Sequence, residues 1–384
     1  MDKKCFYLRT FGCQMNIRDS EVIAGLLTAG GYRITDEPDE ADVIILNTCS
    51  VRQHAEDKVW SQVNNLSKLR ITKDGHTPLI GIVGCMAQNH KERIFERAPQ
   101  VDFVVGPSDI QRIPEIIKKL STIDHRLSAH GFLEKKIWET DGGVRPEEIY
   151  HTGFYGDKEH AYVVISEGCS NFCSYCVVPY VRGTPRNRNY KDITREIEEA
   201  LDKGITRFTL LGQNVNAYQC DGVDFTKLVS LVNSVKGLKE FTFLTSHPKD
   251  TTISLFKAMA DNDKLRKDLH LPIQSGSDRI LEMMNRGYNR KFYLDLTDNY
   301  RRIVKGGTLT TDIILGFPTE TESDFGDTYK LLENVRFNAA YIFKYSPRPN
   351  TAAAGLRDDV AKEEKEKRHA LILELQRMIS KSKK

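Results

Sequence analysis

Three cysteines, Cys169, Cys173 and Cys176, stand at a C-x-x-x-C-x-x-C spacing directly after Gly168. Three thiolates on one short loop can bind three irons of a 4Fe–4S cluster and leave the fourth iron without a protein ligand. An open iron favours chemistry at the cluster, because electron carriers normally complete a four-cysteine set. The alternative is a zinc knuckle, but zinc needs a fourth cysteine or histidine at matched spacing, and none follows within reach.

A second set of three cysteines follows apolar, β-branched runs in the amino-terminal third. The runs cover residues 5–8, 43–46 and 79–83, and the cysteines after them are Cys13, Cys49 and Cys85. Loops after parallel strands converge at the carboxyl edge of an open sheet, so this shared position predicts a second three-cysteine iron–sulfur site. The alternative is three unrelated buried cysteines, since free cysteine is often buried. We interpret Cys5 and Cys220 as packing or surface residues.

The elements that must position the second set alternate between strands and helices. Helical stripes over residues 22–27 and 55–66 separate the apolar runs, and a fourth run covers residues 101–105. This pattern predicts an α/β domain over residues 1–120, a small doubly wound parallel sheet covered on both faces. Residues 121–158 mix small, polar and charged residues with turn signals and are interpreted as a linker.

Residues 159–384 contain six strand-like runs that alternate with helical stripes. The runs lie near residues 162–165, 208–211, 240–244, 269–272, 309–315 and 341–345. Six βα units predict a partial (β/α)6 barrel, with functional residues on the loops that follow the strands. The Cys169 loop follows the first run. A last helix is expected from about residue 361 to 380.

The cysteine loop, with Tyr175 before its last cysteine, resembles the signature of radical S-adenosylmethionine (SAM) enzymes. Residues 11–16, 47–52 and 84–88 are similar to the three auxiliary-cluster motifs of the methylthiotransferases, so the resemblance covers essentially the whole chain. It implies a radical SAM barrel in which SAM binds the open iron through its amino and carboxylate groups. It also implies that the second cluster presents the sulfur that is inserted into the substrate.

Residues 211–218 and 346–349 resemble the tRNA-modifying branch of this family. The resemblance implies methylthiolation of C2 of an N6-isopentenyladenosine next to the tRNA anticodon, with two 4Fe–4S clusters and SAM as cofactors. It implies no catalytic residue beyond the cluster ligands. An electron donor and a sulfur source are further expected partners. The alternatives are another tRNA adenosine, a ribosomal protein or, in a different class, a non-catalytic iron–sulfur RNA-binding or electron-transfer protein.

Polar residues and glycine also follow the other predicted strands. The candidates for the SAM pocket are Tyr175 in the cysteine loop and the strand-end residues Gln213, Asn214, Gln274, Ser275 and Gly316. By position we expect some of them to line the pocket, with Gly316 permitting close approach of the backbone. His247 is interpreted as a structural loop residue, and Met283 and Met284 as core filling.

Four cations stand between residues 182 and 191, beside the cysteine loop. They could contact an RNA backbone or the SAM carboxylate, and the alternative is a solvated turn. The segment departs from the family pattern. Arg188 matches the expected arginine, but Pro185, Asn187 and Asn189 stand where glutamate, serine and proline are usual. The role of that glutamate therefore has no counterpart here.

The whole composition is that of an ordinary globular protein, with 40% hydrophobic and 28% charged residues among 384. The net charge is only +3, so an RNA partner must meet a local basic patch. With no signal peptide, no long apolar run and eight cysteines, we expect a cytoplasmic monomer without a membrane partner. Family members usually continue into an RNA-binding TRAM barrel; the sequence ends at Lys384, and we expect weak, salt-sensitive tRNA binding.

Overall fold

A computed structural model of the chain describes residues 4–50, 53–66, 77–122 and 136–382. The chain divides into two compact units. The first contains Met1–Lys158 with Tyr180–Gly183, and the second contains Glu159–Pro179 with Thr184–Lys384. Among the helices of the described residues, none has the length and apolarity needed to span a membrane.

The first unit contains a six-stranded sheet whose strands are all parallel. Its order is β2 (Arg33–Ile34), β1 (Cys5–Thr10), β3 (Val43–Thr48), β4 (Leu79–Gly84), β5 (Phe103–Val105) and β6 (Ile137–Glu139). β3 and β4 are buried along their whole length, which their apolar sequences permit because helices cover both faces. The doubly wound α/β prediction is confirmed.

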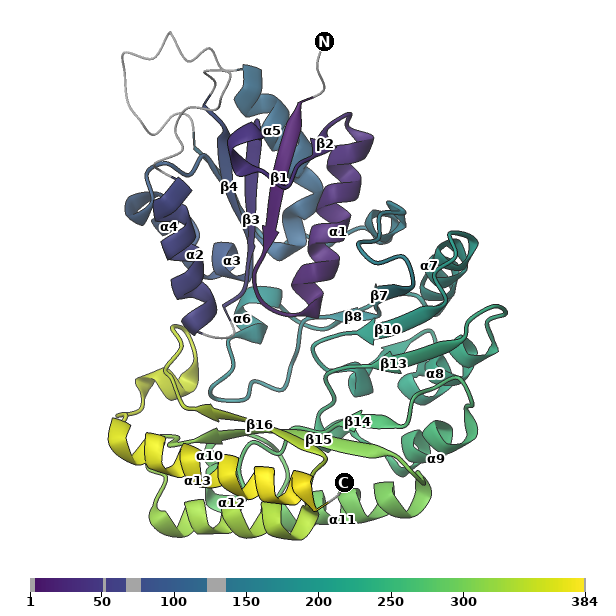
Figure 1. The fold of residues 1–384 in the computed structure, drawn as a ribbon, viewed down its shortest axis with the longest axis vertical. Helices are drawn as coiled ribbons and strands as arrows, with labels where there is room; N and C mark the ends of the chain where they lie inside the picture. The colour runs from purple at the N-terminus through teal and green to yellow at the C-terminus, as the bar shows by residue number, and fades with distance from the viewer. Residues whose placement is uncertain (1–3, 51–52, 67–76, 123–135, 383–384) are drawn as a thin grey trace. The chain divides into compact units, whose positions relative to one another are not determined.

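Helices cover both faces of this sheet (Figure 1). The helices of this unit are α1 (Gln14–Ala29), α2 (Gln53–Leu66), α3 (Cys85–His90), α4 (Arg93–Arg97) and α5 (Ile113–Thr122). Side chains of α2, α3 and α4 form one hydrophobic core with the strands, including Trp60, Met86 and Phe95. α1 and α5 contact each other on the opposite face.

The sequence analysis did not anticipate β2 or β6. β6 lies inside residues 121–158, which were assigned to a linker, and it extends the sheet by pairing Ile137 with Phe103. It has only three residues, and Trp138 at its centre is half exposed, so it carries no buried apolar run to reveal it. The described part of the expected linker therefore belongs to the first unit.

The second unit contains the six strands expected from the sequence, in two three-stranded parallel sheets. Their orders are β13 (Glu240–Phe243), β10 (Arg207–Leu211), β7 (His160–Val164), and β14 (Asp268–His270), β15 (Thr308–Leu315), β16 (Ala339–Lys344). Each strand pairs with a neighbour in chain order within its sheet, as in a (β/α) barrel. This agrees with the predicted partial barrel.

Helices connect these strands and lie outside them (Figure 1). They are α7 (Tyr190–Asp202), α8 (Phe225–Ser234), α9 (Ile253–Asp261), α10 (Asp278–Met283), α11 (Arg290–Ile303), α12 (Glu322–Val335) and α13 (Lys362–Lys381). Side chains cap the first turns of several, including Asn189 at α7, Ser277 at α10 and Thr321 at α12. These caps fix where each loop ends and its helix begins.

Two short antiparallel pairs complete the second unit. β8 (Ser166–Glu167) pairs with β9 (Arg186–Asn187), and β11 (Gln219–Cys220) pairs with β12 (Val223–Asp224). The first pair brackets the stretch that carries Cys169, Cys173 and Cys176. A further short helix, α6 (Val178–Arg182), lies within that stretch.

Candidate metal centres

The first unit brings Cys13, Cys49 and Cys85 together at the carboxyl edge of its sheet. Cys13 caps the start of α1, Cys49 follows β3, and Cys85 opens α3 directly after β4. The Cys13 thiol is hydrogen-bonded to Cys49, and the charge of Cys13 acts on Cys85. The three loops therefore converge as the sequence analysis expected.

Two glycines allow this approach. Gly12 has φ of 122°, and a Cβ there would lie 2.3 Å from Cys49 Cβ. Gly84 has φ of 92°, and a Cβ there would lie 2.5 Å from Asn47 Oδ1. Both positions combine a left-handed backbone with no room for a side chain, so only glycine fits.

A pair of buried asparagines joins the loops of Cys13 and Cys49. Asn16 Nδ2 donates to Asn47 Oδ1 at 3.1 Å and to Thr48 O at 2.8 Å, while Asn47 Nδ2 donates to Asn16 O at 2.8 Å. Both side chains are fully buried. Both residues lie in the ranges 11–16 and 47–52 that resemble the auxiliary-cluster motifs, and the sequence alone indicated no role for them.

A buried ion-pair triad lies beside Cys85. Arg182 Nη2 is 2.7 Å from Asp19 Oδ2, Arg145 Nη1 is 2.8 Å from Asp19 Oδ1, and Arg182 Nε donates to Cys85 Sγ at 3.4 Å. The two arginines exceed the carboxylate by one charge, which favours thiolates. The pKa of Cys13 is lowered to about 6, chiefly by the hydrogen bond with Cys49. Arg182 and the first N–H groups of α1 also lower this pKa, whereas burial of the thiol raises it. Burial raises the pKa of Cys85, and Arg182 opposes this.

In the second unit, backbone and side-chain hydrogen bonds hold the Cys169–Cys176 loop. Ser174 N donates to Met284 O at 3.0 Å, and Ala353 N donates to Ser174 O at 2.7 Å. Asn285 Nδ2 donates to Phe172 O at 3.0 Å. Met284 is fully buried in a core with Phe317 and Tyr345, which confirms its interpretation as core filling and gives the loop a rigid support.

Arg286 and His247 lie against Cys173. Arg286 Nη1 donates to Cys173 Sγ at 3.2 Å, and His247 Nε2 lies 3.8 Å from the same sulfur. Burial, with Arg286 and Lys249, lowers the pKa of His247 to about 2, so the imidazole is neutral. Its Nδ1 accepts from Lys249 N at 3.2 Å, which places the proton on Nε2, facing the sulfur.

The three thiols of this loop also affect one another. Burial raises the pKa of Cys176 to about 12, and the charge of Cys173 adds to the rise. Burial raises the pKa of Cys169 as well, again with a contribution from Cys173. Within the described residues, no group of three His, Cys, Asp or Glu side chains is already arranged to hold a metal ion.

Sequence reasoning missed what surrounds Cys173. His247 was interpreted as a structural loop residue, and Arg286 was not singled out. The available signal was position: His247 follows β13 and Arg286 follows α10, both on the loop side of the barrel strands.

Of the candidate SAM-pocket residues, three lie around the cysteine loop. Gln213 Oε1 accepts from Gly168 N, directly before Cys169. The Tyr175 hydroxyl accepts from Arg286 Nη1 at 3.3 Å. Asn214 is buried and donates to Asp250 Oδ2 at 2.6 Å.

Gln274, Ser275 and Gly316 differ in what they offer. Gln274 has φ of 74°, a strained conformation, and its buried Oε1 has no hydrogen-bond partner among the described residues. Ser275 Oγ instead accepts from Ser277 N at 3.2 Å, a structural use. A Cβ at Gly316 would lie 2.3 Å from Lys365 Cγ, so the close approach that requires glycine there is made by Lys365.

Other buried polar atoms near these residues also lack partners in the described part of the chain. They are Ser174 Oγ, Asn214 Oδ1 and Ser246 Oγ. Buried polar groups are rarely left unpaired in proteins without a reason, and a bound polar ligand is one such reason.

The cationic segment 182–191 is not an exposed patch. Arg182 is buried against Asp19, and Arg188 is buried against Asp192 and Glu196. The expectation that the cations contact an RNA backbone or the SAM carboxylate is therefore wrong for these two arginines, because each is buried and already paired with a carboxylate of this chain. Arg186 pairs with Glu167 at 3.4 Å, and Lys191 is exposed.

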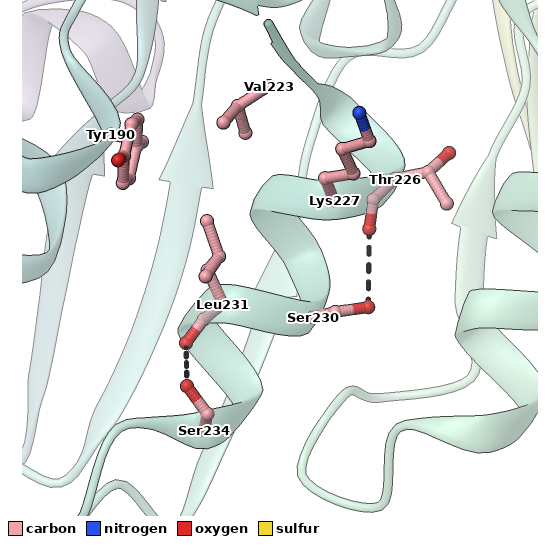
Figure 2. Close-up of a pocket in the computed structure, with 7 residues that line it drawn as sticks. All are labelled: Tyr190, Val223, Thr226, Lys227, Ser230, Leu231 and Ser234. Atoms are coloured by element: carbon pink, nitrogen blue, oxygen red, sulfur yellow. Dashed lines mark hydrogen bonds between the residues drawn. The ribbon is translucent and has the colours of Figure 1, made fainter.

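A hollow of about 570 Å³ lies along α8, and no cysteine is among the residues that line it (Figure 2). Lys227 is its only charged lining residue. Ser230 and Ser234 line it but donate to backbone oxygens of their own helix, at Thr226 and Leu231. Lys227 Nζ donates to Gly222 O at 3.0 Å, so these three polar side chains make structural contacts.

Comparisons with known proteins decide the family. Residues 5–106 match the uncharacterized protein family UPF0004, and residues 163–332 match the Radical SAM superfamily. The chain is 42% identical to the tRNA-2-methylthio-N(6)-dimethylallyladenosine synthase of Moorella thermoacetica, over 99% of this chain and 84% of that protein. The chain belongs to this family of radical SAM methylthiotransferases. The synthase of Geobacter sulfurreducens is also 42% identical, over 100% and 84% of the two chains.

Solved structures agree with the fold. The radical S-adenosylmethionine methyltransferase TsrM of Kitasatospora setae, solved with cobalamin and a [4Fe-4S] cluster, matches with a TM-score of 0.64. The match covers 92% of this chain and 77% of that chain at 12% identity. At this identity the likeness concerns the fold alone.

Proposed function

We propose that this enzyme methylthiolates C2 of N6-isopentenyladenosine next to the anticodon of tRNA. One observation carries the proposal: each unit brings three cysteines together, from three loops after strands in the first unit and on a single loop in the second, in a chain of the family described above. Cys169, Cys173 and Cys176 would hold the first 4Fe–4S cluster. Cys13, Cys49 and Cys85 would hold the second.

The residues around each triplet fit such a group. In the first unit Gly12 and Gly84 leave room for the sulfurs to approach, and Arg182 supplies positive charge to the anionic ligands. In the second unit Arg286 and His247 direct N–H groups at Cys173. Metal-ligating sulfurs are generally stabilised by such donors.

When bound, the first cluster and SAM supply the one-electron chemistry that activates C2 of the base, while the second cluster and another SAM supply the methylthio group. The protein holds the groups in place and excludes water. The unpaired oxygens of Gln274 and Asn214 and the hydroxyl of Ser246 are candidates for the polar atoms of SAM. Gln213 keeps the cysteine loop in place through Gly168 N.

The substrate partner is tRNA. Bases in an anticodon loop are unpaired and can be turned outward, which makes C2 of the adenine accessible to an enzyme. An external electron donor and a sulfur source complete the reaction, and we propose that the enzyme acts as a monomer.

The proposal is tested by replacing each cysteine triplet with alanine. The Cys13, Cys49 and Cys85 variant should retain about half of the iron, because each site holds one cluster. It should still cleave SAM to deoxyadenosine but insert no sulfur into tRNA. The variant at Cys169, Cys173 and Cys176 should also retain about half of the iron but release no deoxyadenosine. Iron per chain, deoxyadenosine and modified nucleosides are measured for both.

Full methylthiolation by the variant at Cys13, Cys49 and Cys85 would contradict the proposal that these cysteines hold a second cluster. An unchanged iron content in that variant would mean that the three cysteines are packing residues. The nucleosides of a deletion strain identify the substrate. If the deletion strain lacks the methylthio group on a different adenosine, or on a ribosomal protein, that molecule is the substrate in place of the proposed one. The proposed chemistry would stay the same.

A further inference from the structure

Arg286 is a buried cation beside the first cysteine triplet. It follows α10, and only 3% of the residue is exposed. Its Nε donates to Tyr288 OH at 2.9 Å and its Nη2 donates to Pro272 O at 2.6 Å. The remaining nitrogen, Nη1, donates to Cys173 Sγ at 3.2 Å and to Tyr175 OH at 3.3 Å.

These contacts leave the charge of Arg286 without a carboxylate. Two tyrosine hydroxyls and a peptide oxygen are neutral, and no ion pair within the described residues includes Arg286. The other buried arginines near the cysteine sites differ, since Arg182 pairs with Asp19 and Arg188 with Asp192. A buried guanidinium is costly unless an opposite charge compensates it. Cys173 is the one group in contact with Arg286 that carries negative charge when it ligates a metal.

We propose that Arg286 is the electrostatic partner of the first cluster and raises its reduction potential. This inference rests on the proposed function. Reduction adds one negative charge to the cluster, so a fixed positive charge and an N–H···S hydrogen bond stabilise the reduced form more than the oxidised form. Arg286 is thus a positioning residue that adjusts the electron-accepting step and also neutralises the ligated loop. His247 adds a neutral N–H donor to the same sulfur.

The two buried arginines that contact cysteine sulfurs have different partners. Arg182 reaches Cys85 but shares its charge with Asp19, whereas the described contacts of Arg286 direct its charge at Cys173 alone. The charge of Arg286 thus lies at the cluster that must accept an electron from outside, with no carboxylate between them among its described contacts.

The test measures the potential of the first cluster by itself. The full chain carrying alanine at Cys13, Cys49 and Cys85 is the parent, so that one cluster gives the signal. Arg286→Gln and Arg286→Lys are made in this parent, with Arg279→Gln as the matched control. Arg279 is on α10, and its side chain, 46% exposed, pairs with Asp324 rather than with a cysteine. Each protein is reconstituted, its iron is counted, and its cluster is titrated by electron paramagnetic resonance without SAM.

Removing the charge should lower the ratio of reduced to oxidised cluster about tenfold at a fixed solution potential, a fall of about 59 mV for a one-electron couple. Arg286→Lys keeps the charge and should remain near the parent, and Arg279→Gln should not differ from it. A merely structural role would alter stability or iron content and leave the potential in place.

The proposal is overturned if Arg286→Gln binds its cluster at the parent's potential, or if Arg286→Lys falls as far as Arg286→Gln. If Arg286→Gln loads no iron, loading by Arg286→Lys supports the requirement for charge, and failure of both overturns it. If Arg286→Gln does not fold, the cluster potential of Arg286→Lys is compared with that of the parent. A potential near the parent's supports the proposal, and a lower potential overturns it. A parent without iron would contradict the proposed function itself.

Discussion

At the scale of single residues, the glycines before Cys13 and Cys85 decide whether three sulfurs can meet. The backbone at Gly12 passes so close to Cys49 that a methyl group there would overlap the Cys49 side chain. The glycine is therefore required by the neighbouring loop as well as by its own φ of 122°. These two requirements can be separated by experiment.

Gly12→Ala should prevent assembly of the second cluster, because the new Cβ displaces Cys49 from the position shared with Cys13. We expect iron to fall to about half, with deoxyadenosine formation retained and methylthiolation lost. The matched control is Gly31→Ala, which has φ of 90° but nothing within 4 Å of the added carbon. Iron loss in both variants would assign the effect to backbone strain, contrary to this prediction.

At the scale of elements, one carboxylate ties the starts of two barrel helices together. Asp324 belongs to the first turn of α12, where Thr321 N donates to its Oδ2 at 2.9 Å in a capping box. Ser277, the cap of α10, donates to Asp324 Oδ1 at 2.5 Å, and Arg279 pairs with the same carboxylate. Burial by itself would raise the pKa of Asp324, but the hydrogen bonds from Arg279, Ser277 and Thr321 outweigh it, and the pKa lies well below its usual value.

Asp324→Asn should lower the free energy of unfolding at pH 7 by about 2 kcal/mol, the scale of hydrogen bonds to a charged group. The folded pKa is depressed, so the stabilisation is fully present above the unfolded pKa of about 4 and is lost as the pH falls through the folded pKa. The gap between wild type and variant should therefore shrink below about pH 4. Urea unfolding at several pH values measures it, with the exposed Asp298→Asn on α11 as control. A gap that stays constant with pH would contradict the prediction.

The short helix α6 contributes a buried arginine to the first unit. Arg182 is its last residue, and it shares the buried carboxylate of Asp19 with Arg145. Removal of Arg182 leaves one oxygen of the buried Asp19 carboxylate without its charged donor, which is a strong destabilisation in a site that water does not reach.

Arg182→Met should lower the free energy of unfolding by about 3 kcal/mol, the lower end of the range for a broken buried pair, since Arg145 still faces Asp19. The control is Arg195→Met on α7, whose side chain is 56% exposed beside Asp192 and should cost less than about 1 kcal/mol. Both are measured by urea unfolding. Equal costs for the two variants would mean that the buried triad does not stabilise the unit.

At the scale of the whole molecule, each unit has its own sheet, core and cysteine triplet. The described partners of Cys85 and Cys13 belong to the first unit, including Arg182. Those of Cys173 belong to the second. The loops of each triplet are therefore held by contacts within one unit and, in the proposed function, by one cluster.

Removal of iron by chelation should increase hydrogen exchange in two separate sets of segments, because metal ligands cross-link the loops that carry them. These are residues 11–16, 47–50 and 84–88 in the first unit, and residues 168–176 and 284–286 in the second. The strand β15, which is hydrogen-bonded on both sides in its sheet, serves as an internal reference. Each triple-alanine variant should show the change in its own unit only. An increase in both units from either triplet would contradict separate sites.

Much of this organisation is determined by the sequence alone. Apolar runs of strand length that alternate with helical stripes allowed the main strands of both units to be assigned from the chain. β3 and β4 are buried on both faces, whereas β15 is fully buried on one face only. Because cysteines after such runs must lie at one sheet edge, the convergence of Cys13, Cys49 and Cys85 followed as well. A short, half-exposed strand such as β6 gives no such signal, and it was missed.

Only the tertiary structure decided which polar side chains serve the sulfurs. Arg182 lies 97 residues from Cys85 in the sequence, and Arg286 lies 113 residues from Cys173. Local periodicity reports which face of an element is buried, but it carries no information on which distant charge shares that interior. The sequence therefore allowed Arg182 to be interpreted as a surface cation and gave no reason to notice Arg286. Arg182 is buried beside a carboxylate, whereas Arg286 is buried beside a thiol and contacts no carboxylate among the described residues. This difference in surroundings separates their roles.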